Sequence, residues 1–263
     1  MMRKKQKLLV AKIGGNIIED QVQLQQFLAD FAQLKQPKIL IHGGGKEATK
    51  LAAKLGIETT MIAGRRVTTA EELDIVVQIY AGLVNKSIVA TLQKYGCDAI
   101  GMSGADANAI SADKRPAKPI DYGYAGDIKS VNGTSINKLI EIGLVPVFCA
   151  VTHDNKGQLL NTNADTIAAE LAVAMSPYFE TSLFYCFELP GVLTDIHDND
   201  SVIEHINLET YNALKKAETI RDGMLPKLQN CFEALHRNLK EVHIANAEFI
   251  SNPNCKHTKL TLQ

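Results

Sequence analysis

The sequence has no excess of charge of either sign and no long uninterrupted apolar run. Its 263 residues include 28 Lys and Arg against 29 Asp and Glu, which leaves a formal net charge of −1. Proteins that bind nucleic acids or anionic membranes use an excess of positive charge, so the composition argues against both partners. No stretch approaches the roughly 18 consecutive apolar residues of a membrane span. The composition is that of an ordinary globular protein.

Paired cysteines are also missing. The five cysteines are far apart, none belongs to a C-x-x-C pair, and no histidine stands at the spacing of a zinc ligand: Cys97, Cys149, Cys186, Cys231 and Cys255. The apolar run that begins at Leu8 is interrupted by Lys12, too early for the apolar core of a signal peptide. We therefore expect reduced thiols, a cytoplasmic location and no metal site built from protein ligands.

Runs of β-forming apolar residues alternate with helical patterns, which predicts an α/β fold with a mainly parallel central sheet covered by helices. Strands are predicted at residues 7–13, 38–42, 97–101, 145–151, 182–187 and 241–245. Helices are predicted at about 20–35, 45–56, 70–94, 135–143, 166–175, 207–217 and 223–238. Thr69 and Glu72 have the spacing of a capping box before the helix over 70–94. The segment 102–135 is rich in Gly, Asp, Asn and Pro and could form a lid or rim, and YGYAGDIKSV (122–131) within it is typical of one or two β-hairpins.

Two predicted strands end in glycine turns that open helices. The first turn is KIGGN (12–16), and the second is HGGGK (42–46). Such turns present backbone N–H groups to an anion at a helix N-terminus, in the crevice at the carboxyl ends of parallel strands. Phosphate is the natural ligand there, although each turn alone could simply be a tight turn that glycine permits.

Neither turn matches a standard nucleotide motif. The P-loop and the dinucleotide fingerprint need other spacings, because Lys46 follows three glycines directly and precedes Glu47. HGGG is also the oxyanion-hole motif of many esterases. The nearest candidate for a nucleophile, GMSGA (101–105), lacks the spacing G-x-S-x-G, so acyl hydrolysis is disfavoured.

Five polar residues are further candidates for the chemistry. Lys12 lies near the end of an apolar strand, where a bound anion would offset its charge, although the side chain could also reach solvent. Lys227 stands at the start of a predicted helix and means little alone. Arg66 could hold a carboxylate through two hydrogen bonds or could be an ordinary surface arginine. Asp165 could belong to a helix cap, and Asn161 could be a turn residue.

Six segments resemble, in this order and across nearly the whole chain, the motifs of the amino-acid kinase family. They are KIGG (12–15), HGGG (42–45), RVT (66–68), VNK (84–86), NTNAD (161–165) and DGMLPK (222–227). The first two indicate only the superfamily. The segments RVT, N-x-NAD and GM-x-PK are more specific and favour the branch that acts on acylglutamates over the kinases of carbamate, uridylate, aspartate or glutamate.

The resemblance implies an ATP-dependent kinase of arginine biosynthesis that phosphorylates the γ-carboxylate of an N-acylated glutamate, N-acetyl-L-glutamate first of all. It implies a three-layer αβα sandwich with two lobes. Residues 1–178 would bind the acylglutamate and form a homodimer, and residues 179–263 would bind ATP. ATP and Mg²⁺ are the implied cofactors, and Mg²⁺ needs few protein ligands because it binds largely through the nucleotide.

The resemblance also assigns roles to residues. Lys12 and Lys227 would neutralise charge on the transferring phosphoryl group, and Asp165 would orient both lysines. Backbone amides of the glycine turns would bind phosphate oxygens and substrate: Gly14, Gly15, Gly43, Gly44 and Gly45. Arg66 and Asn161 would hold the carboxylate and neighbouring polar groups of the acylglutamate. No general base is needed, because the nucleophilic carboxylate is already ionised at neutral pH.

Three segments depart from the family pattern. FEL (187–189) stands where Thr/Ser-Asp-Val would line the nucleotide site, SGADA (103–107) replaces Ser-Gly-Lys-Asp-Gly, and VTH (151–153) replaces Ile-Gly. We expect these changes to lie near the acyl group, which leaves a larger group, N-succinylglutamate first, as an alternative substrate. Two further hypotheses are a kinase of this family that acts on a different acid and a non-catalytic binding protein of the same fold.

The sequence has only about six residues before the first predicted strand. In some members of the family an N-terminal helix joins dimers into hexamers that arginine inhibits. The resemblance therefore leads us to expect a homodimer that arginine does not inhibit.

Overall fold

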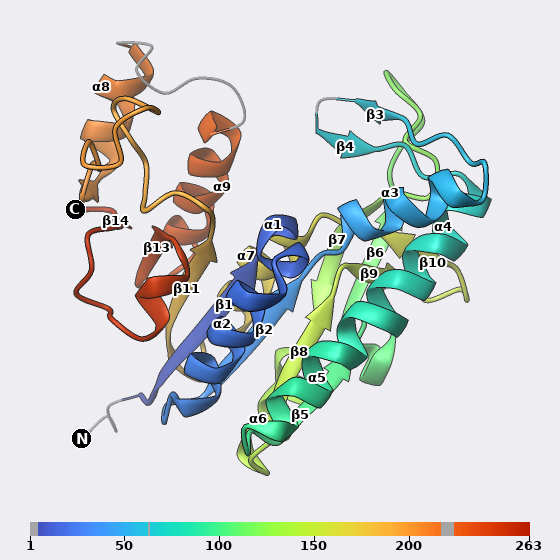
Figure 1. The fold of residues 1–263 in the computed structure, drawn as a ribbon, viewed down its shortest axis with the longest axis horizontal. Helices are drawn as coiled ribbons and strands as arrows, with labels where there is room; N and C mark the ends of the chain where they lie inside the picture. Colours follow the sequence, from blue (N-terminus) through green and yellow to red (C-terminus); the bar gives the residue numbers. More distant parts are fainter. Residues whose placement is uncertain (1–4, 63, 217–223) are drawn as a thin grey trace.

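The computed structural model describes residues 5–62, 64–216 and 224–263 of the chain, and a central sheet runs through it (Figure 1). The order of its eight strands is β12-β14-β13-β11-β1-β2-β8-β5. Their bounds are β1 Lys7–Ile13, β2 Lys38–His42, β5 Ala99–Met102, β8 Val145–Cys149, β11 Glu180–Cys186, β12 His205–Ile206, β13 Glu241–Ala245 and β14 Thr258–Leu260. Strands β13 and β14 pair antiparallel, whereas the other neighbours pair parallel. The predicted mainly parallel sheet is confirmed.

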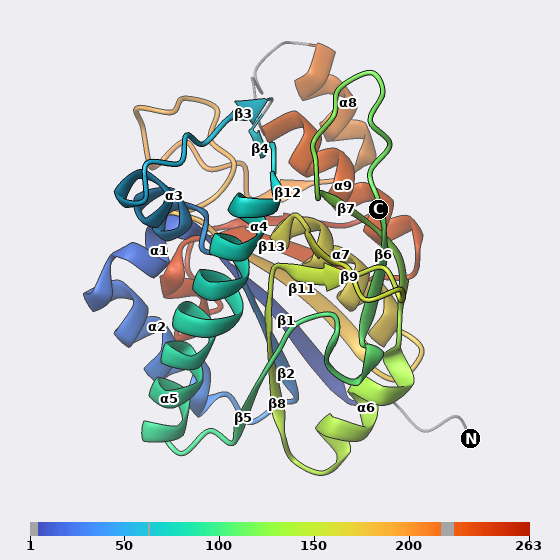
Figure 2. The same ribbon diagram turned by 90° about the vertical axis from the view of Figure 1, so that its right-hand side faces the viewer.

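Helices cover both faces of this sheet (Figure 2). On one side lie α1 Gly15–Glu19, α2 Gln21–Gln33, α3 Gly45–Lys54, α4 Ala70–Val77 and α5 Asn85–Lys94. On the other side lie α6 Gly133–Glu141, α7 Ala164–Met175, α8 Leu208–Lys216 and α9 Met224–His236. A short 3₁₀ turn, η3 Ala247–Ile250, packs against α2. Large apolar side chains such as Phe27, Phe148 and Phe184 are fully buried between the layers. The molecule is therefore the three-layer αβα sandwich that the resemblance implies.

The residues between β5 and α7 build a second, smaller sheet at one edge of the molecule. Its order is β10-β9-β6-β7, with β6 Ile110–Lys114, β7 Gly126–Val131, β9 Val151–His153 and β10 Leu159–Asn161. A 3₁₀ turn, η2 Asp106–Asn108, precedes β6, and a separate two-stranded hairpin joins β3 Met61–Ile62 to β4 Arg65–Arg66. Strands β6 and β7 pair antiparallel, so a hairpin lies within 102–135, but the stretch 122–131 supplies only its second strand, β7, and forms no hairpin by itself.

Three predicted strands have other bounds in the structure, among them the strand predicted over 182–187, which is β11, Glu180–Cys186. The single strand predicted over 145–151 is wrong, because the chain bends at Ala150 and passes from β8 in the central sheet to β9 in the small one. Both pieces are buried and apolar, so the local pattern does not show that they join different sheets. The strand predicted from Cys97 begins two residues later, since the Cys97 N–H still bonds to the Leu92 carbonyl at the end of α5.

The predicted helix over 70–94 is continuous and consists of α4, a π-helical segment η1 Gln78–Val84, and α5. Thr69 and Glu72 form the predicted capping box in both directions. By length and composition alone, Ala70–Lys94 could cross a membrane, and 44% of its most apolar window is buried inside the molecule. Core helices of soluble proteins meet the same criterion, and the buried side of this helix, which includes Val76 and Ile88, packs into the central core.

The carboxyl ends of three neighbouring strands determine where a ligand can bind. Ile13 at the end of β1 is in register with His42 of β2 on one side and with Cys186 of β11 on the other. The sheet therefore continues across the lobe boundary predicted at residues 178 and 179, and the division into two lobes stays a prediction. Both glycine turns begin at this edge of the sheet.

Candidate active site

A cavity of about 890 Å³ opens at the carboxyl ends of β1, β2 and β11. Nine of the predicted site residues line it: Lys12, Gly14, Gly15, Gly43, Gly44, Gly45, Arg66, Asn161 and Lys227. Asp165 is the exception, because it lies behind the surface of the cavity and contacts it through Lys12. The structure therefore brings together residues that are more than 200 positions apart in the sequence.

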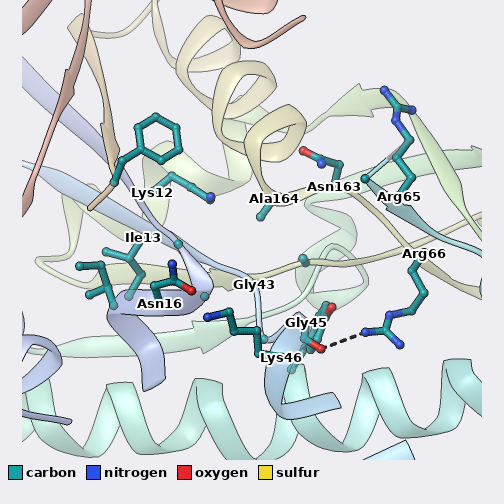
Figure 3. A pocket seen from close by; sticks show the side chains of 18 of the residues that line it. Lys12, Ile13, Asn16, Gly43, Gly45, Lys46, Arg65, Arg66, Asn163 and Ala164 are labelled. Atoms are coloured by element: carbon teal, nitrogen blue, oxygen red, sulfur yellow. Dashed lines mark hydrogen bonds between the residues drawn. The ribbon is translucent and has the colours of Figure 1, made fainter. Parts of the chain in front are cut away.

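The two glycine turns leave the first backbone N–H groups of two helices without side-chain caps. Gly14 precedes α1 and Gly44 precedes α3, and neither helix start receives a side-chain hydrogen bond. The uncapped N–H groups at a helix start are available to an anion, whose charge the helix dipole also favours. Figure 3 shows Asn16 and Lys46 near Gly43 of the second turn, with Lys12 above them. The turns fit the predicted phosphate cradle.

Lys12 is nearly buried at the end of β1, and its charge is balanced inside the protein. Its Nζ lies 2.8 Å from Asp165 Oδ1. Asp165 is in the first turn of α7, whose N-cap residue Asn163 accepts hydrogen bonds from the N–H groups of Asp165 and Thr166. The contact is an ion pair without aligned hydrogen-bond geometry, since Asp165 Oδ1 is buried and has no hydrogen-bond partner among the described residues. The start of α7 thus sets the position of the lysine.

Lys227 comes from α9, on the opposite side of the sheet edge from the glycine turns, and it lines the same cavity. Its Nζ lies 4.4 Å from the centroid of the Phe187 ring, and Lys12 Nζ lies 5.7 Å from the same centroid. Phe187 follows β11 directly. Two ammonium groups therefore approach one aromatic ring at the cavity, an arrangement that the sequence analysis did not predict.

Arg66 makes four hydrogen bonds inside the protein. It donates to Thr59 Oγ1 at 2.9 Å, Glu72 Oε1 at 3.3 Å, the Gly45 carbonyl at 2.9 Å and Thr49 Oγ1 at 2.7 Å. The guanidinium also interacts with the hydroxyl of Tyr80, so its five N–H groups are largely engaged within the protein. Figure 3 shows the bond to Gly45 and the side chain of Arg66 beside the second glycine turn. Arg66 braces that turn, and its predicted contact with the substrate stays a prediction.

Asn161 lies at the end of β10 and faces the cavity from the small sheet. Its Nδ2 donates to Thr68 Oγ1 at 3.0 Å, and its backbone N–H bonds to the Tyr124 carbonyl. The side-chain oxygen makes no hydrogen bond to a described residue and can accept one from a ligand. The structure therefore joins Asn161 and Arg66 in one cavity, as the resemblance implies.

His42 holds the second glycine turn from inside the core. The ring is fully buried, with Nδ1 2.7 Å from the Gly43 carbonyl and Nε2 3.0 Å from Asn85 Nδ2. Since Asn85 Nδ2 can only donate, Nε2 accepts and the ring proton is on Nδ1, which gives a neutral imidazole. Burial lowers the pKa of His42 from 6.5 to about 4, and the nearby Lys86 charge acts in the same direction. The neutral ring of His42 therefore supports the second glycine turn from inside the core.

Several cavity residues carry no signal in the sequence. Arg115, in the β6–β7 hairpin, forms a bidentate ion pair with Asp127 and lies over the ring of Tyr122. Arg65 and Lys46 also line the cavity. The folded hairpins bring Arg115 and Arg65 to the site, so the local sequence could not identify these two, whereas Lys46 directly follows the second glycine turn in the sequence.

Two of the three unusual segments lie away from the cavity surface. Segments 103–107 and 151–153 contact each other through the Gly104 N–H and the Val151 carbonyl, 2.7 Å apart, but neither lines the cavity. We expected both segments to lie near the acyl group, but neither of them reaches the surface of the cavity. Thr152 lies one layer behind, 2.7 Å from the hydroxyl of Thr162, which does line the cavity. Phe187 and Glu188 of the third segment also line it.

Three comparisons place the chain among known proteins. A model described as the amino acid kinase family matches residues 7–246. The chain is 52% identical to the acetylglutamate kinase of Cytophaga hutchinsonii over 92% of each chain, and 50% identical to that of Bacteroides fragilis over 94% of each. A solved structure of an N-acetylglutamate synthase from Neisseria gonorrhoeae, complexed with coenzyme A and N-acetyl-glutamate, has a similar fold. Its TM-score is 0.81 at 24% identity, and the match covers all of this chain and 60% of that one.

Proposed function

The chain belongs to the amino acid kinase family, and from this premise we infer that it phosphorylates the γ-carboxylate of N-acetyl-L-glutamate with ATP. The main observation behind this inference is sequence identity. The chain is 50% to 52% identical to two acetylglutamate kinases over 92% to 94% of both chains. The reaction gives an acyl phosphate and ADP and belongs to the biosynthesis of arginine. The cavity supplies the cations and backbone donors that this transfer requires.

The chemistry needs positive charge and orientation, and it needs no general base. The attacking carboxylate is ionised at neutral pH, so no proton has to be removed from it. The difficulty is to bring this anion close to the phosphates of ATP. Phosphoryl transfer is accelerated chiefly by positioning and by positive groups matched to the charge of the transition state.

We assign these tasks to residues of the cavity. Lys12 and Lys227 neutralise the transferring phosphoryl group, and Asp165 holds Lys12 in place. The ion pair of 2.8 Å supports the role of Asp165 toward Lys12. Its predicted action on Lys227 rests on the resemblance alone. Backbone N–H groups of the turns at 14–15 and 43–45 bind the phosphate oxygens, as their uncapped helix starts suggest.

Arg66 and Asn161 bind the acylglutamate in this proposal. The positive charge of Arg66 can attract a carboxylate, and the side-chain oxygen of Asn161 can accept the N–H of an amide. Both residues line the side of the cavity that belongs to residues 1–178, whereas Phe187 and Lys227 line the side formed by residues 179–263. This division supports the proposal that the acid binds in the first segment and ATP in the second.

Mg²⁺ is proposed as the ion that accompanies ATP. The described residues hold no group of three His, Cys, Asp or Glu side chains that could bind a metal by itself. Mg²⁺ keeps several waters and commonly uses one or two carboxylates with substrate phosphates, so the cavity carboxylate of Glu188 fits such an ion. When bound, Mg²⁺ neutralises charge on the phosphates.

We also propose a cytoplasmic homodimer without nucleic-acid or membrane partners. Much of the apolar window in helix 70–94 is not buried inside one chain, and Leu83 is 58% exposed there. A second copy could cover this surface. Light scattering should give twice the chain mass, and a monomer or hexamer would contradict the proposal. Insensitivity to arginine stays a prediction that the same kinase assay can check.

The function is tested by measuring ADP release with ATP and Mg²⁺. N-acetyl-L-glutamate should be turned over, and unacylated glutamate should not. Aspartate, carbamate and UMP are the acceptors of the competing kinase hypothesis, and turnover of one of these alone would contradict ours. If no acceptor leads to ADP release, a non-catalytic binding protein would be favoured.

N-succinyl-L-glutamate is the second candidate substrate and belongs in the same assay. The guanidinium of Arg115 lines the cavity next to Ala125 and Gly126 and could pair with a second carboxylate on the acyl group. Arg115 already pairs with Asp127, however, and this pairing reduces its attraction for another anion. A higher kcat/KM with the succinyl compound would establish the larger acyl group.

A further inference from the structure

Phe187 presents one aromatic ring to both lysines of the cavity. Lys227 Nζ lies 4.4 Å and Lys12 Nζ 5.7 Å from the ring centroid, within the distance of a cation–π contact. The two lysines come from different elements, strand β1 and helix α9, which are far apart in the sequence. Phe187 is therefore a contact that the two cations share.

The position and plane of this ring are fixed by its neighbours. The backbone N–H of Phe187 bonds to the carbonyl of Ala245 at 2.8 Å. The ring stacks on Tyr185, with centroids 6.1 Å apart and planes 19° apart. Tyr185 is almost fully buried, and its hydroxyl donates to the backbone carbonyl of Asp165 at 3.0 Å. The ring is thus tied to the same helix start that holds Lys12.

The two lysines differ in their other partners. Lys12 has the carboxylate of Asp165 at 2.8 Å. Among residues 5–62, 64–216 and 224–263, no carboxylate lies within 4.0 Å of Lys227 Nζ, so the face of Phe187 is the group that attracts this ammonium. A ring quadrupole attracts a cation and carries no net charge.

We propose that Phe187 is a positioning residue that holds the ammonium groups of Lys227 and Lys12 toward the cavity before the phosphates bind. This role rests on the proposed kinase function of the cavity. A carboxylate in the place of the ring would also hold the lysines, but it would cancel the charge that the transferring phosphoryl group needs. The ring orients both cations and leaves their charge available.

This role predicts an effect on kcat rather than on KM. Misplaced lysines would lose contacts that are strongest in the transition state, while the acylglutamate would still bind to its own residues. Fluorination of the phenyl ring at Phe187, with one, two and three fluorines, weakens the negative face and changes the shape of the ring little. We expect kcat to fall stepwise along this series, by about tenfold in total.

Substitutions provide the matched comparison. Phe187→Leu should lower kcat at least as much as full fluorination, whereas Phe187→Trp, which supplies a stronger π face, should retain most of the activity. Tyr95→Leu is the control, because it removes a similar contact with Lys94, 5.2 Å from ring to ammonium, at the end of α5 and away from the cavity. Its kcat should equal that of the wild type.

A second readout does not depend on activity. In the unliganded protein, the ring current of Phe187 should shift the ε-methylene proton resonances of Lys227, and Phe187→Leu should abolish this shift. An equal kcat throughout the fluorinated series, or lysine resonances that do not respond to Phe187→Leu, would overturn the proposal. A wild-type protein that turns over no acylglutamate would contradict the kinase function, and the lysine resonances would still decide whether Phe187 holds the cations.

Discussion

The ammonium of Lys12 lies 2.8 Å from the carboxylate of Asp165, and this pair joins the end of β1 to the first turn of α7. Both side chains are largely buried, so water weakens their attraction little. The two residues of the pair differ in their position relative to the cavity. Asp165 lies behind the lysine, and the ammonium remains on the lining of the cavity, where an anion can approach it.

Asp165→Asn should lower kcat by about 10²-fold, because a misplaced catalytic group costs rates of that order. The substitution keeps the shape of the side chain and removes the charge that holds Lys12. The KM for N-acetyl-L-glutamate should change less than kcat. Asp113→Asn is the control, since it breaks an exposed ion pair with Lys129 in the small sheet. Steady-state kinetics of both variants checks the prediction, and an unchanged kcat in Asp165→Asn would refute it.

Lys227→Ala should lower kcat by about 10²- to 10³-fold, the usual effect of removing one group that stabilises transition-state charge. Binding of the acylglutamate should survive, because its proposed contacts, Arg66 and Asn161, are elsewhere in the cavity. Lys215→Ala removes an exposed lysine from neighbouring α8 and should leave kcat unchanged. Calorimetric titration with N-acetyl-L-glutamate separates binding from turnover. Wild-type turnover in Lys227→Ala would remove this residue from the mechanism.

Local signals in the sequence predicted the frame of the fold. The strands at 7–13, 38–42 and 241–245 have the predicted bounds, since each is a short apolar run with clear ends. The capping box of Thr69 and Glu72 is local as well and is confirmed. The short strands β3, β10, β12 and β14 were not predicted. They have two or three residues each, too few to show a strand pattern, and β12 and β14 also depend on partners far away in the chain.

The site was predictable where it depends on motifs and not where it depends on folding. Lys12 and the glycine turns could be placed together because the carboxyl ends of parallel strands meet. The four protein hydrogen bonds of Arg66 could not be foreseen, since their acceptors come from α3, α4 and the loop before β3. The Phe187 ring was noticed only as a departure from a family pattern, and its two lysines became visible with the structure.

Gly44→Ala should disrupt the second glycine turn, whereas Gly45→Ala should be tolerated by the fold. A Cβ at Gly44 would lie 2.7 Å from Tyr80 Cδ1 and 3.0 Å from Tyr80 Cε1, so the turn or the buried ring must move. At Gly45 the nearest atom would be the Tyr80 hydroxyl at 3.5 Å, an ordinary contact.

We expect Gly44→Ala to cost about 1–3 kcal/mol of unfolding free energy, as overpacking commonly does. Urea unfolding of the two alanine variants gives the comparison directly. Tyr80→Leu in the Gly44→Ala background should recover part of the loss, because the smaller side chain makes room for the new methyl group. Equal stabilities of Gly44→Ala and Gly45→Ala would show that Tyr80 does not constrain the turn.

The stability of the protein should fall as the pH decreases from about 6.5 to about 4 through His42. Burial lowers the pKa of His42 in the folded protein from 6.5 to about 4. In this interval the unfolded chain binds a proton that the folded protein does not, so acid favours unfolding. The full loss below both pKa values would be about 3 kcal/mol.

His42→Asn should flatten this part of the pH profile, because the titrating ring is gone. The variant will also be less stable at neutral pH, since His42 accepts a bond from Asn85 and donates one to the Gly43 carbonyl. The slope with pH, measured by urea unfolding, is therefore the decisive quantity. Burial also lowers the pKa of His257, which adds a slope of the same sign in both proteins. His197→Gln, in an exposed loop, should keep the wild-type slope. If His42→Asn also keeps the wild-type slope of stability with pH, the buried imidazole of His42 does not control acid stability.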